Sequence, residues 1–188
     1  MAQLLTRLRG VPDRLLHAAR RRAALATLLA RRPPAHVLVV CNGNIFRSPF
    51  AAAVLERAAG PRVQVDSGGW IGPGRPSPAG ALTAAARFGV DLSAHRAQLV
   101  TAEVVRWADL VLVMDERQRR TVCDRFGRRS RDVVILGDLD PQPIVSRGIE
   151  DPVEQSVAVC QRAYARIERC MAELVKALWG APARTGTR

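Results

Sequence analysis

One short stretch of the chain combines residue types that could act together on an anion. The segment VVCNGNIFRSPFAAAVLERA, residues 39–58, begins with strand-forming residues and ends with helix-forming ones, and Cys41 lies at the junction. Arg47 follows six residues later, directly before Ser48 and Pro49. Cys41 is a reactive nucleophile only if the surrounding chain stabilises its thiolate, and it is otherwise an ordinary buried thiol.

The residues between Cys41 and the helix are suited to binding a phosphate group. Ser48 is typical of a helix N-cap and Pro49 of a first helical position, so we expect the helix to start there. A loop that leads into a helix N-terminus turns its backbone N–H groups toward one point and adds the positive end of the helix dipole. The expected phosphate loop comprises Asn42, Gly43, Asn44, Ile45 and Phe46, followed by Arg47 and Ser48.

Individual side chains of this loop have separate expected tasks. Gly43 allows close approach of the backbone, and Asn44 tolerates a left-handed conformation better than most residues. Arg47 can form two parallel hydrogen bonds to phosphate oxygens. The field that binds phosphate also favours the thiolate of Cys41, to which Ser48 could donate a hydrogen bond. The loop lacks the GxxxxGK[ST] pattern of a Walker loop, and GPGRPS lacks the third glycine of a dinucleotide fingerprint.

A thiolate that attacks phosphorus also needs a proton donor for the leaving oxygen. Asp115 ends a predicted strand, and Asp151 lies in GIEDPVEQ before the last helix, where Pro152 would stiffen the loop. The remaining aspartates that we considered are typical of caps or exposed turns: Asp13, Asp91, Asp124, Asp132, Asp138 and Asp140. Spacing alone leaves Asp115 and Asp151 as alternatives.

Strand and helix patterns alternate along the chain after Pro34. Short apolar runs predict strands at 36–40, 63–69, 110–115 and 132–138. Helical patterns lie at 48–59, 77–90, 101–108, 116–126 and 153–179. This alternation predicts an α/β fold, a four-stranded parallel sheet with helices on both faces. Ligands bind at the carboxyl ends of strands in such sheets, which is where Cys41 would lie.

The length predicts one domain, which we place at residues 35–180, with a basic helical extension at 1–34 and a loose tail at 181–188. We interpret the extension either as an extra helix or as a helix that docks on a membrane surface or on a partner. If it is an extra helix, activity should persist without it. No apolar run of about 18 residues is present, so we expect no membrane span.

The cysteines, the histidines and the net charge limit the location, the metals or cofactors, and the partners that we expect. The four cysteines lack a pairing pattern, which favours a reducing, cytoplasmic location, and three distant histidines predict no metal and no cofactor. The net charge of +12 comes from 29 basic residues of which only Lys176 is lysine, a bias typical of a GC-rich genome. Without a motif or interleaved aromatics, we expect no nucleic acid, whereas an anionic substrate suits the charge.

Taken in order, these motifs resemble the low-molecular-weight protein tyrosine phosphatase family. The resemblance covers about residues 36–178 and rests on VLVVCNGNIFRSP, VDSGGW, GRPSPAGALTAAARFGVDLSAHRAQLV, DLVLVMDE and IEDP. It implies the flavodoxin-like phosphotyrosine phosphatase I fold and a metal-free hydrolase that forms a cysteinyl-phosphate intermediate. It also implies Cys41 as nucleophile, Arg47 as phosphate clamp and Asp151 as proton donor. The supporting shell that it implies is Asn44, Ser48, Ser67 and His95, and the substrate is a phosphotyrosine protein, such as a kinase of polysaccharide export, or a small aryl phosphate.

The chain departs from the family pattern at two positions. Phe46 replaces a second loop cysteine, which removes the partner for a protective disulfide, and Val153 replaces an aromatic residue of the phosphotyrosine pocket. Trp70 and Phe46 are candidates for part of that wall. A thioredoxin-coupled arsenate reductase is the nearest alternative, but its relay needs two further cysteines, and only Cys123 follows the third strand at a comparable place. A non-catalytic phosphopeptide-binding module would not need Cys41, Arg47 and Asp151 together.

Overall fold

A four-stranded parallel sheet forms the centre of the protein. The structure is a computed structural model that describes residues 11–180. Its strands are β1 (His36–Val40), β2 (Gln64–Gly68), β3 (Leu110–Val113) and β4 (Val133–Ile135), in the spatial order β2-β1-β3-β4. Every neighbouring pair is parallel. The predicted sheet is therefore confirmed, although β3 and β4 each end earlier than expected.

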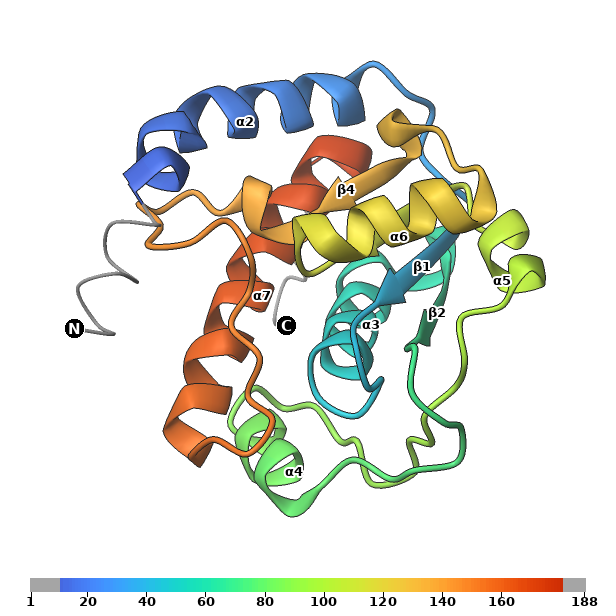
Figure 1. Cartoon of the computed structure of the whole chain (residues 1–188), viewed down its shortest axis with the longest axis vertical. Coiled ribbons are helices and arrows are strands. Elements are labelled where there is room, and N and C mark those ends of the chain that lie inside the picture. The colour runs from blue at the N-terminus through green and yellow to red at the C-terminus, as the bar shows by residue number, and fades with distance from the viewer. Residues whose placement is uncertain (1–10, 181–188) are drawn as a thin grey trace, which may run out of the picture.

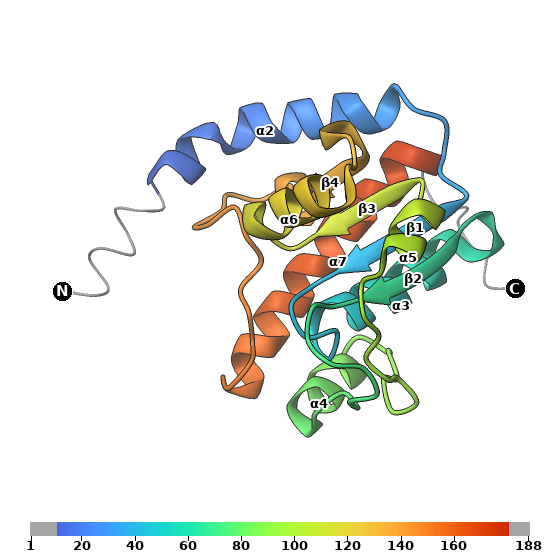
Figure 2. The same cartoon turned by 45° about the vertical axis from the view of Figure 1, so that its right-hand side comes forward.

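Alternation along the strands divides the core into two layers (Figures 1 and 2). In β1, Val37 and Val39 face one apolar cluster, whereas Leu38 and Val40 face the other. The first cluster is covered by α3 (Arg47–Ala59), α4 (Ala79–Ala86) and α7 (Val157–Trp179). The second is covered by α5 (Ala102–Trp107) and α6 (Glu116–Phe126). Because both faces are covered, β3 and β4 are apolar throughout and β1 is apolar from Val37 onward, whereas the edge strand β2 (QVDSG) includes polar residues.

Two helix starts differ from expectation. The prediction of Ser48 as an N-cap is wrong, because α3 begins at Arg47 and the Ser48 hydroxyl instead contacts Cys41 and Asn44. The last helix begins at Val157 rather than at 153. Glu154 has a left-handed backbone conformation (φ 58°), which interrupts any helix through it.

The N-terminal extension contains α2 (Val11–Leu29), which lies beside the edge strand β4 (Figure 1). Leu28 is fully buried against the main core, and His17 Nε2 lies 2.9 Å from the carbonyl oxygen of Asp140. Arg21 pairs with Glu173 on α7. The helix thus packs against α7 and the turn Leu136–Leu139 that follows β4. Residues 1–10 and 181–188, which complete the predicted extension and tail, lie outside the described residues.

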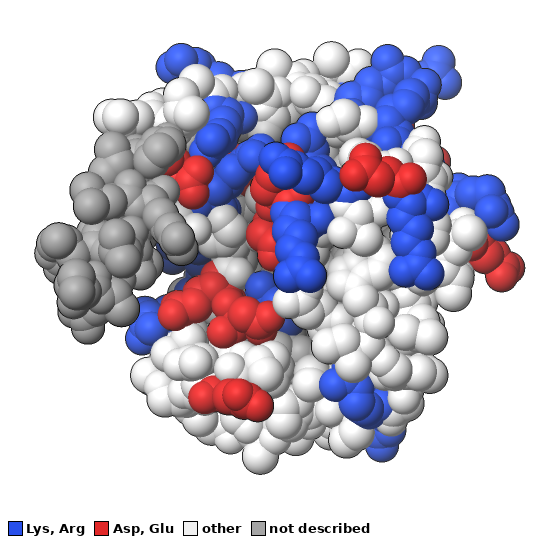
Figure 3. Space-filling view, viewed as in Figure 1, with Lys and Arg blue, Asp and Glu red and all other residues white. Residues whose placement is uncertain are grey.

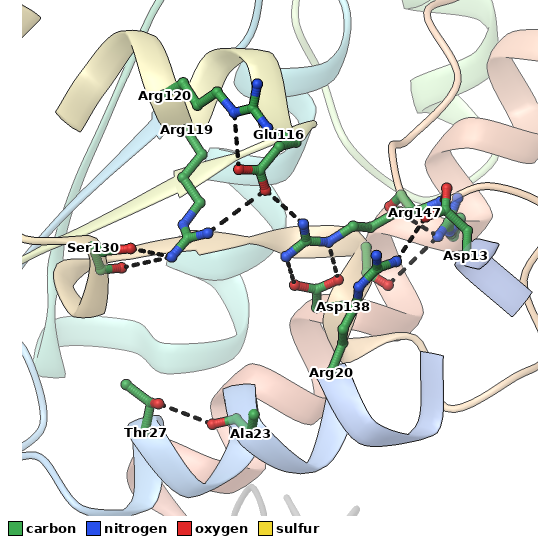
Figure 4. A network of polar contacts seen from close by, with 12 residues as sticks. Asp13, Arg20, Ala23, Thr27, Glu116, Arg119, Arg120, Ser130, Asp138 and Arg147 are labelled. Carbon is green, nitrogen blue, oxygen red and sulfur yellow. Dashed lines mark hydrogen bonds and ion pairs between the residues drawn. The ribbon is translucent and has the colours of Figure 1, made fainter. Parts of the chain in front are cut away.

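Charged side chains join α2 to the segment that precedes Asp151 (Figure 4). Asp13 accepts hydrogen bonds from Arg20 Nη1 at 2.7 Å and from the backbone N–H of Arg147 at 2.9 Å. The Arg147 guanidinium in turn donates two hydrogen bonds to Asp138, at 2.8 and 2.7 Å, and one to Glu116 at 2.5 Å. These bonds hold α2, α6 and the loop after β4 together.

Within residues 11–180, no helix is long and apolar enough to cross a membrane.

Candidate active site

The carboxyl ends of β1 and β3 meet at the loop that contains Cys41. Cys41 follows β1 directly, and α3 begins six residues later at Arg47. The backbone N–H of Cys41 still donates to the carbonyl oxygen of Gly68 at the end of β2, 3.1 Å away. This is the position in the sheet at which the sequence predicts a ligand site.

The sulfur of Cys41 has hydrogen-bonding partners within its own loop. Cys41 is only 2% exposed. The backbone N–H of Asn44 donates to Sγ at 3.2 Å, and the Ser48 hydroxyl lies 3.0 Å from the same atom. The surroundings therefore differ from those of an ordinary apolar cysteine.

Asn44 is the residue that holds the loop in shape. Its backbone is left-handed (φ 51°), as the sequence predicts, and its side chain is fully buried. Nδ2 donates to the hydroxyls of Ser48 and Ser67, both at 2.9 Å, and Oδ1 accepts the backbone N–H of Gln98 at 2.7 Å. His95 Nε2 lies 2.7 Å from the Asn44 carbonyl oxygen. The structure thus brings the predicted supporting residues together and adds the backbone of Gln98.

Arg47 reaches from the start of α3 to the loop that contains Asp151. It is 2% exposed, and its Nη1 donates to the carbonyl oxygen of Ile149 at 3.0 Å. Its Nη2 pairs with the carboxylate of Asp151, which also accepts a hydrogen bond from Asn42 Nδ2 at 3.2 Å. Among the described residues, the buried Nε of Arg47 has no hydrogen-bond partner. A buried donor without a partner is available to an anion that binds beside it.

Asp115, the other candidate proton donor, is engaged elsewhere. Its Oδ1 accepts the backbone N–H of Gln118 at 2.8 Å and so caps α6, while its Oδ2 accepts from Gln118 Nε2 at 3.2 Å. The carboxylate that contacts Arg47 is that of Asp151. Geometry therefore separates two aspartates that spacing could not.

Three residues that the sequence analysis did not identify also contact the loop. Gln118 is 2% exposed, and its Nε2 lies 3.2 Å from Asn42 Oδ1. Arg75 donates from Nη2 to the carbonyl oxygen of Gly43 at 2.7 Å. The fully buried Tyr164 donates its hydroxyl to the carbonyl oxygen of Phe46 at 3.1 Å. Tyr164 is the chain's only tyrosine, and its place on the apolar face of an amphipathic helix is the one signal that could have drawn attention to it.

The aromatic wall expected for a phosphotyrosine pocket is only partly present. Trp70 donates its backbone N–H to the carbonyl oxygen of Asn42 at 2.7 Å, and its ring stacks with Phe126 at a centroid distance of 6.2 Å. Phe46 instead packs against the main core, while Ile45 is half-buried within the loop. Val153 is 43% exposed and presents only an aliphatic side chain.

The other three cysteines have the properties of structural thiols. All four cysteines are free, and burial raises the pKa of the Cys160 thiol and raises that of Cys170 to about 12. Partial burial also raises the pKa of Cys123. Within the described part of the chain, no group of three or more His, Cys, Asp or Glu residues could hold a metal ion.

Comparison with known proteins gives consistent matches over this region. A family model described as low molecular weight phosphotyrosine protein phosphatase matches residues 36–181. The probable low molecular weight protein-tyrosine-phosphatase EpsP of Ralstonia solanacearum is 39% identical over 135 residues, covering 71% of this chain and 88% of that protein. Etp of Escherichia coli K12, named as a phosphatase of the same kind, is 33% identical over 143 residues, covering 76% and 93%.

Solved structures agree with these matches. The tyrosine phosphatase AmsI of Erwinia amylovora has a TM-score of 0.71 and 30% identity, covering 78% of this chain and 94% of that one. The YwlE arginine phosphatase of Geobacillus stearothermophilus has a TM-score of 0.69 and 28% identity, covering 77% and 93%. The family match begins at residue 36, so α2 precedes the matched region.

Proposed function

The chain belongs to the low molecular weight protein tyrosine phosphatase family, and on this premise we propose that it hydrolyses phosphotyrosine through a cysteinyl-phosphate intermediate. The observation that carries the proposal is the convergence of Cys41, Arg47 and Asp151 on one loop. Phosphotyrosine in proteins is the natural substrate class that we propose, and small aryl phosphates would serve as simpler substrates.

In the first step, the Cys41 thiolate attacks phosphorus, and an S–P bond forms as the bond to the tyrosyl oxygen breaks. Asp151 gives its proton to that oxygen, so tyrosine leaves as a neutral phenol. Arg47 and the backbone N–H groups of the loop stabilise the charge on the three transferring oxygens. In the second step, the Asp151 carboxylate takes a proton from water, which attacks phosphorus and releases inorganic phosphate and the Cys41 thiolate.

The pairing of Asp151 with Arg47 supports this division of labour. A phosphate dianion that binds Arg47 would compete with the Asp151 carboxylate for the guanidinium. The displaced carboxyl would then be free to turn toward the leaving oxygen, where the first step needs a proton donor. Nε of Arg47, which has no partner within residues 11–180, is the donor available for a second hydrogen bond to phosphate.

The contacts of the supporting shell suit a positioning role. We assign the maintenance of loop shape to Asn44, Ser48, Ser67 and His95, since their hydrogen bonds meet at the Asn44 side chain and carbonyl. Residues 35–180 would form the phosphatase domain and residues 1–34 an extension to it. The absence of any pairing among the four free cysteines supports a cytoplasmic location.

Turnover of aryl phosphates with poor and good leaving groups, measured with EDTA present, tests the proposal. Cys41→Ser should reduce turnover to background. Asp151→Asn should slow phenyl phosphate by about 10²- to 10⁴-fold, and p-nitrophenyl phosphate by less, because a better leaving group needs the proton less. Asp115→Asn is a matched control, since asparagine caps a helix as well as aspartate does. Leaving-group dependence that follows Asp115 rather than Asp151 would reverse the assignment.

Two further substrates separate the alternatives within the same fold. Arsenate with thioredoxin tests for a reductase, for which Cys123 on α6 is the single cysteine after β3 in a comparable place. A phosphoarginine peptide tests for the activity that the YwlE neighbour's name states. Turnover of either one in preference to a phosphotyrosine peptide would overturn the proposed substrate class.

A further inference from the structure

A groove lies next to the loop at 41–47, which we call the catalytic loop. The groove is between α6 and the segment that follows β2. It encloses about 410 Å³, with Trp70 and Ile71 on one side and Arg117, Thr121 and Arg125 on the other. No Asp or Glu is among the described residues that line it. Ile71 is 54% exposed, so the groove offers apolar surface together with positive charge.

Asn42 connects this groove with the catalytic loop. Its Nδ2 donates to Asp151, while its Oδ1 accepts from Gln118 Nε2, each at 3.2 Å. Gln118 in turn lies beside Arg117 at the start of α6. A peptide whose phosphotyrosine occupies the loop would therefore pass Asn42 as it enters the groove.

The two arginines of the groove lie on one face of α6, eight residues apart, with Thr121 midway between them. Arg117, Thr121 and Arg125 follow the i, i+4, i+8 spacing, which separates the two arginines by about 12 Å along the helix axis. An extended peptide spans that distance in about four residues. The Arg125 guanidinium lies 5.5 Å from the centroid of the Phe126 ring, which itself stacks with Trp70.

These two arginines differ from their neighbours on the same helix. Arg119 and Arg120 both pair with Glu116, whereas within residues 11–180 neither Arg117 nor Arg125 has an acidic partner. Figure 3 shows basic side chains gathered over α6 on this face of the molecule. Unpaired cations beside a site for anions favour further negative charge on the same ligand.

We propose that this groove is a substrate subsite, in which Arg117 and Arg125 bind anionic groups of the peptide next to the phosphotyrosine. The inference rests on the proposed function and specifies its substrate class, a peptide with carboxylate or additional phosphate groups within about four residues of the phosphotyrosine. Trp70 and Ile71 contact the apolar parts of that peptide, and Arg47 keeps its task at the scissile phosphate.

The test compares peptides that share one phosphotyrosine sequence and differ only in flanking charge. One has neutral flanks, one has Glu at the positions two to four residues to either side, and one has phosphoserine at those positions. We expect kcat/KM for the anionic peptides to exceed that for the neutral peptide by about 4- to 25-fold, from about 2- to 5-fold for each arginine. Because these charges are solvent-exposed, the preference should shrink between about 50 and 300 mM salt.

Variants assign the preference to the groove. Arg117→Gln and Arg125→Gln should each remove about 2- to 5-fold of it, with p-nitrophenyl phosphate turnover unchanged because that substrate has no flanking residues. Arg120→Gln is the matched control, since it makes the same charge change on the same helix outside the groove. A larger effect on the phosphoserine peptide would identify phosphate, and an equal effect on both peptides would identify general negative charge, as the chemistry recognised.

Two results would overturn the inference. One is an unchanged preference for anionic peptides in Arg117→Gln and Arg125→Gln, and the other is an equal loss in Arg120→Gln, which would indicate only the overall field. Failure of the proposed function is distinguishable, because the wild-type protein would then turn over neither p-nitrophenyl phosphate nor the neutral phosphotyrosine peptide.

Discussion

A methyl group added at Gly69 should disturb the catalytic loop more than any neighbouring structure. Gly69 follows β2, and a Cβ at this position would lie 2.7 Å from the Asn42 carbonyl oxygen, 2.8 Å from the Asn44 nitrogen and 2.9 Å from the Gly43 carbonyl carbon. Non-bonded heavy atoms prefer separations of about 3.5 Å or more, so the loop or Gly69 must move by about 0.6–0.8 Å.

The backbone of Gly69 has little freedom to retreat. Its N–H donates to the carbonyl oxygen of Gln98, and its own carbonyl oxygen accepts the N–H of Val100, both at 2.9 Å. The next residue, Trp70, donates to the Asn42 carbonyl at 2.7 Å. With Gly69 held from behind, most of the displacement should fall on the loop.

The expected cost follows from what the displaced atoms do. The nitrogen of Asn44 donates to Cys41 Sγ, and a misplacement of about 1 Å at reacting groups can cost about 10²-fold in rate. We therefore expect Gly69→Ala to lower kcat/KM for p-nitrophenyl phosphate by about 10- to 100-fold. Overpacking should also cost about 1–3 kcal/mol of stability, which leaves a typical domain folded at low temperature.

Gly72→Ala is the control, because a Cβ there meets no atom within 4 Å and the backbone conformation suits any residue. Kinetics at about 10 °C and circular dichroism melts of both variants complete the assay. A folded Gly69→Ala protein with activity within twofold of Gly72→Ala would refute the reasoning that the loop is held from behind.

Three other changes test different parts of the structure. Tyr164→Phe, which removes the hydroxyl that donates to Phe46, should lower stability by about 0.5–1.5 kcal/mol and reduce kcat several-fold; an unchanged melting temperature and kcat would contradict this. Protein that begins at Pro34 should keep its activity but melt about 5–10 °C lower, since α2 no longer packs against α7 and the turn after β4; either an unchanged melting temperature or a folded, inactive protein would be evidence against it. Iodoacetamide at neutral pH should label Cys41, with protection by inorganic phosphate, and should spare the two α7 thiols whose pKa burial raises; mass spectrometry that finds the α7 thiols labelled in folded protein would exclude this.

The sheet could be predicted because local pattern and tertiary burial agree in it. The run VLVV at 37–40 is apolar and rich in β-branched valine, as is typical of a strand covered on both faces. The loop at 41–48 could also be predicted, because a cysteine, a residue that tolerates φ > 0 and a helix N-terminus follow in order within this short segment. The start of α3 could not be predicted, because the Ser48 hydroxyl contacts Cys41 and Asn44 of the same loop rather than the helix end.

Residues that contact the loop from distant positions in the sequence were not predicted, for one physical reason. Gln118 meets Asn42 across 76 positions, and Tyr164 meets Phe46 across 118. Glutamine in a helix is common, and an aromatic residue in an apolar helix is ordinarily core. Nothing in the local pattern distinguishes the hydrogen-bonded members of these classes from the rest, because the partner is supplied only by folding.

The choice between Asp115 and Asp151 as proton donor could not be made from their positions after predicted strands and loops. The loop before α7 runs alongside the end of β3, where the Ile149 N–H donates to the Met114 carbonyl at 2.9 Å and a Cβ on Gly148 would lie 3.2 Å from Asp115 Cβ. Both aspartates therefore lie at the same edge of the sheet, and strand position alone gives them equal access to the site. What separates them is hydrogen bonding, since Asp115 caps α6 and Asp151 is left to meet Arg47. An N-cap signature after a strand is thus evidence against a catalytic carboxylate at that position, and Asp115 followed three residues later by Gln118 has the form of one.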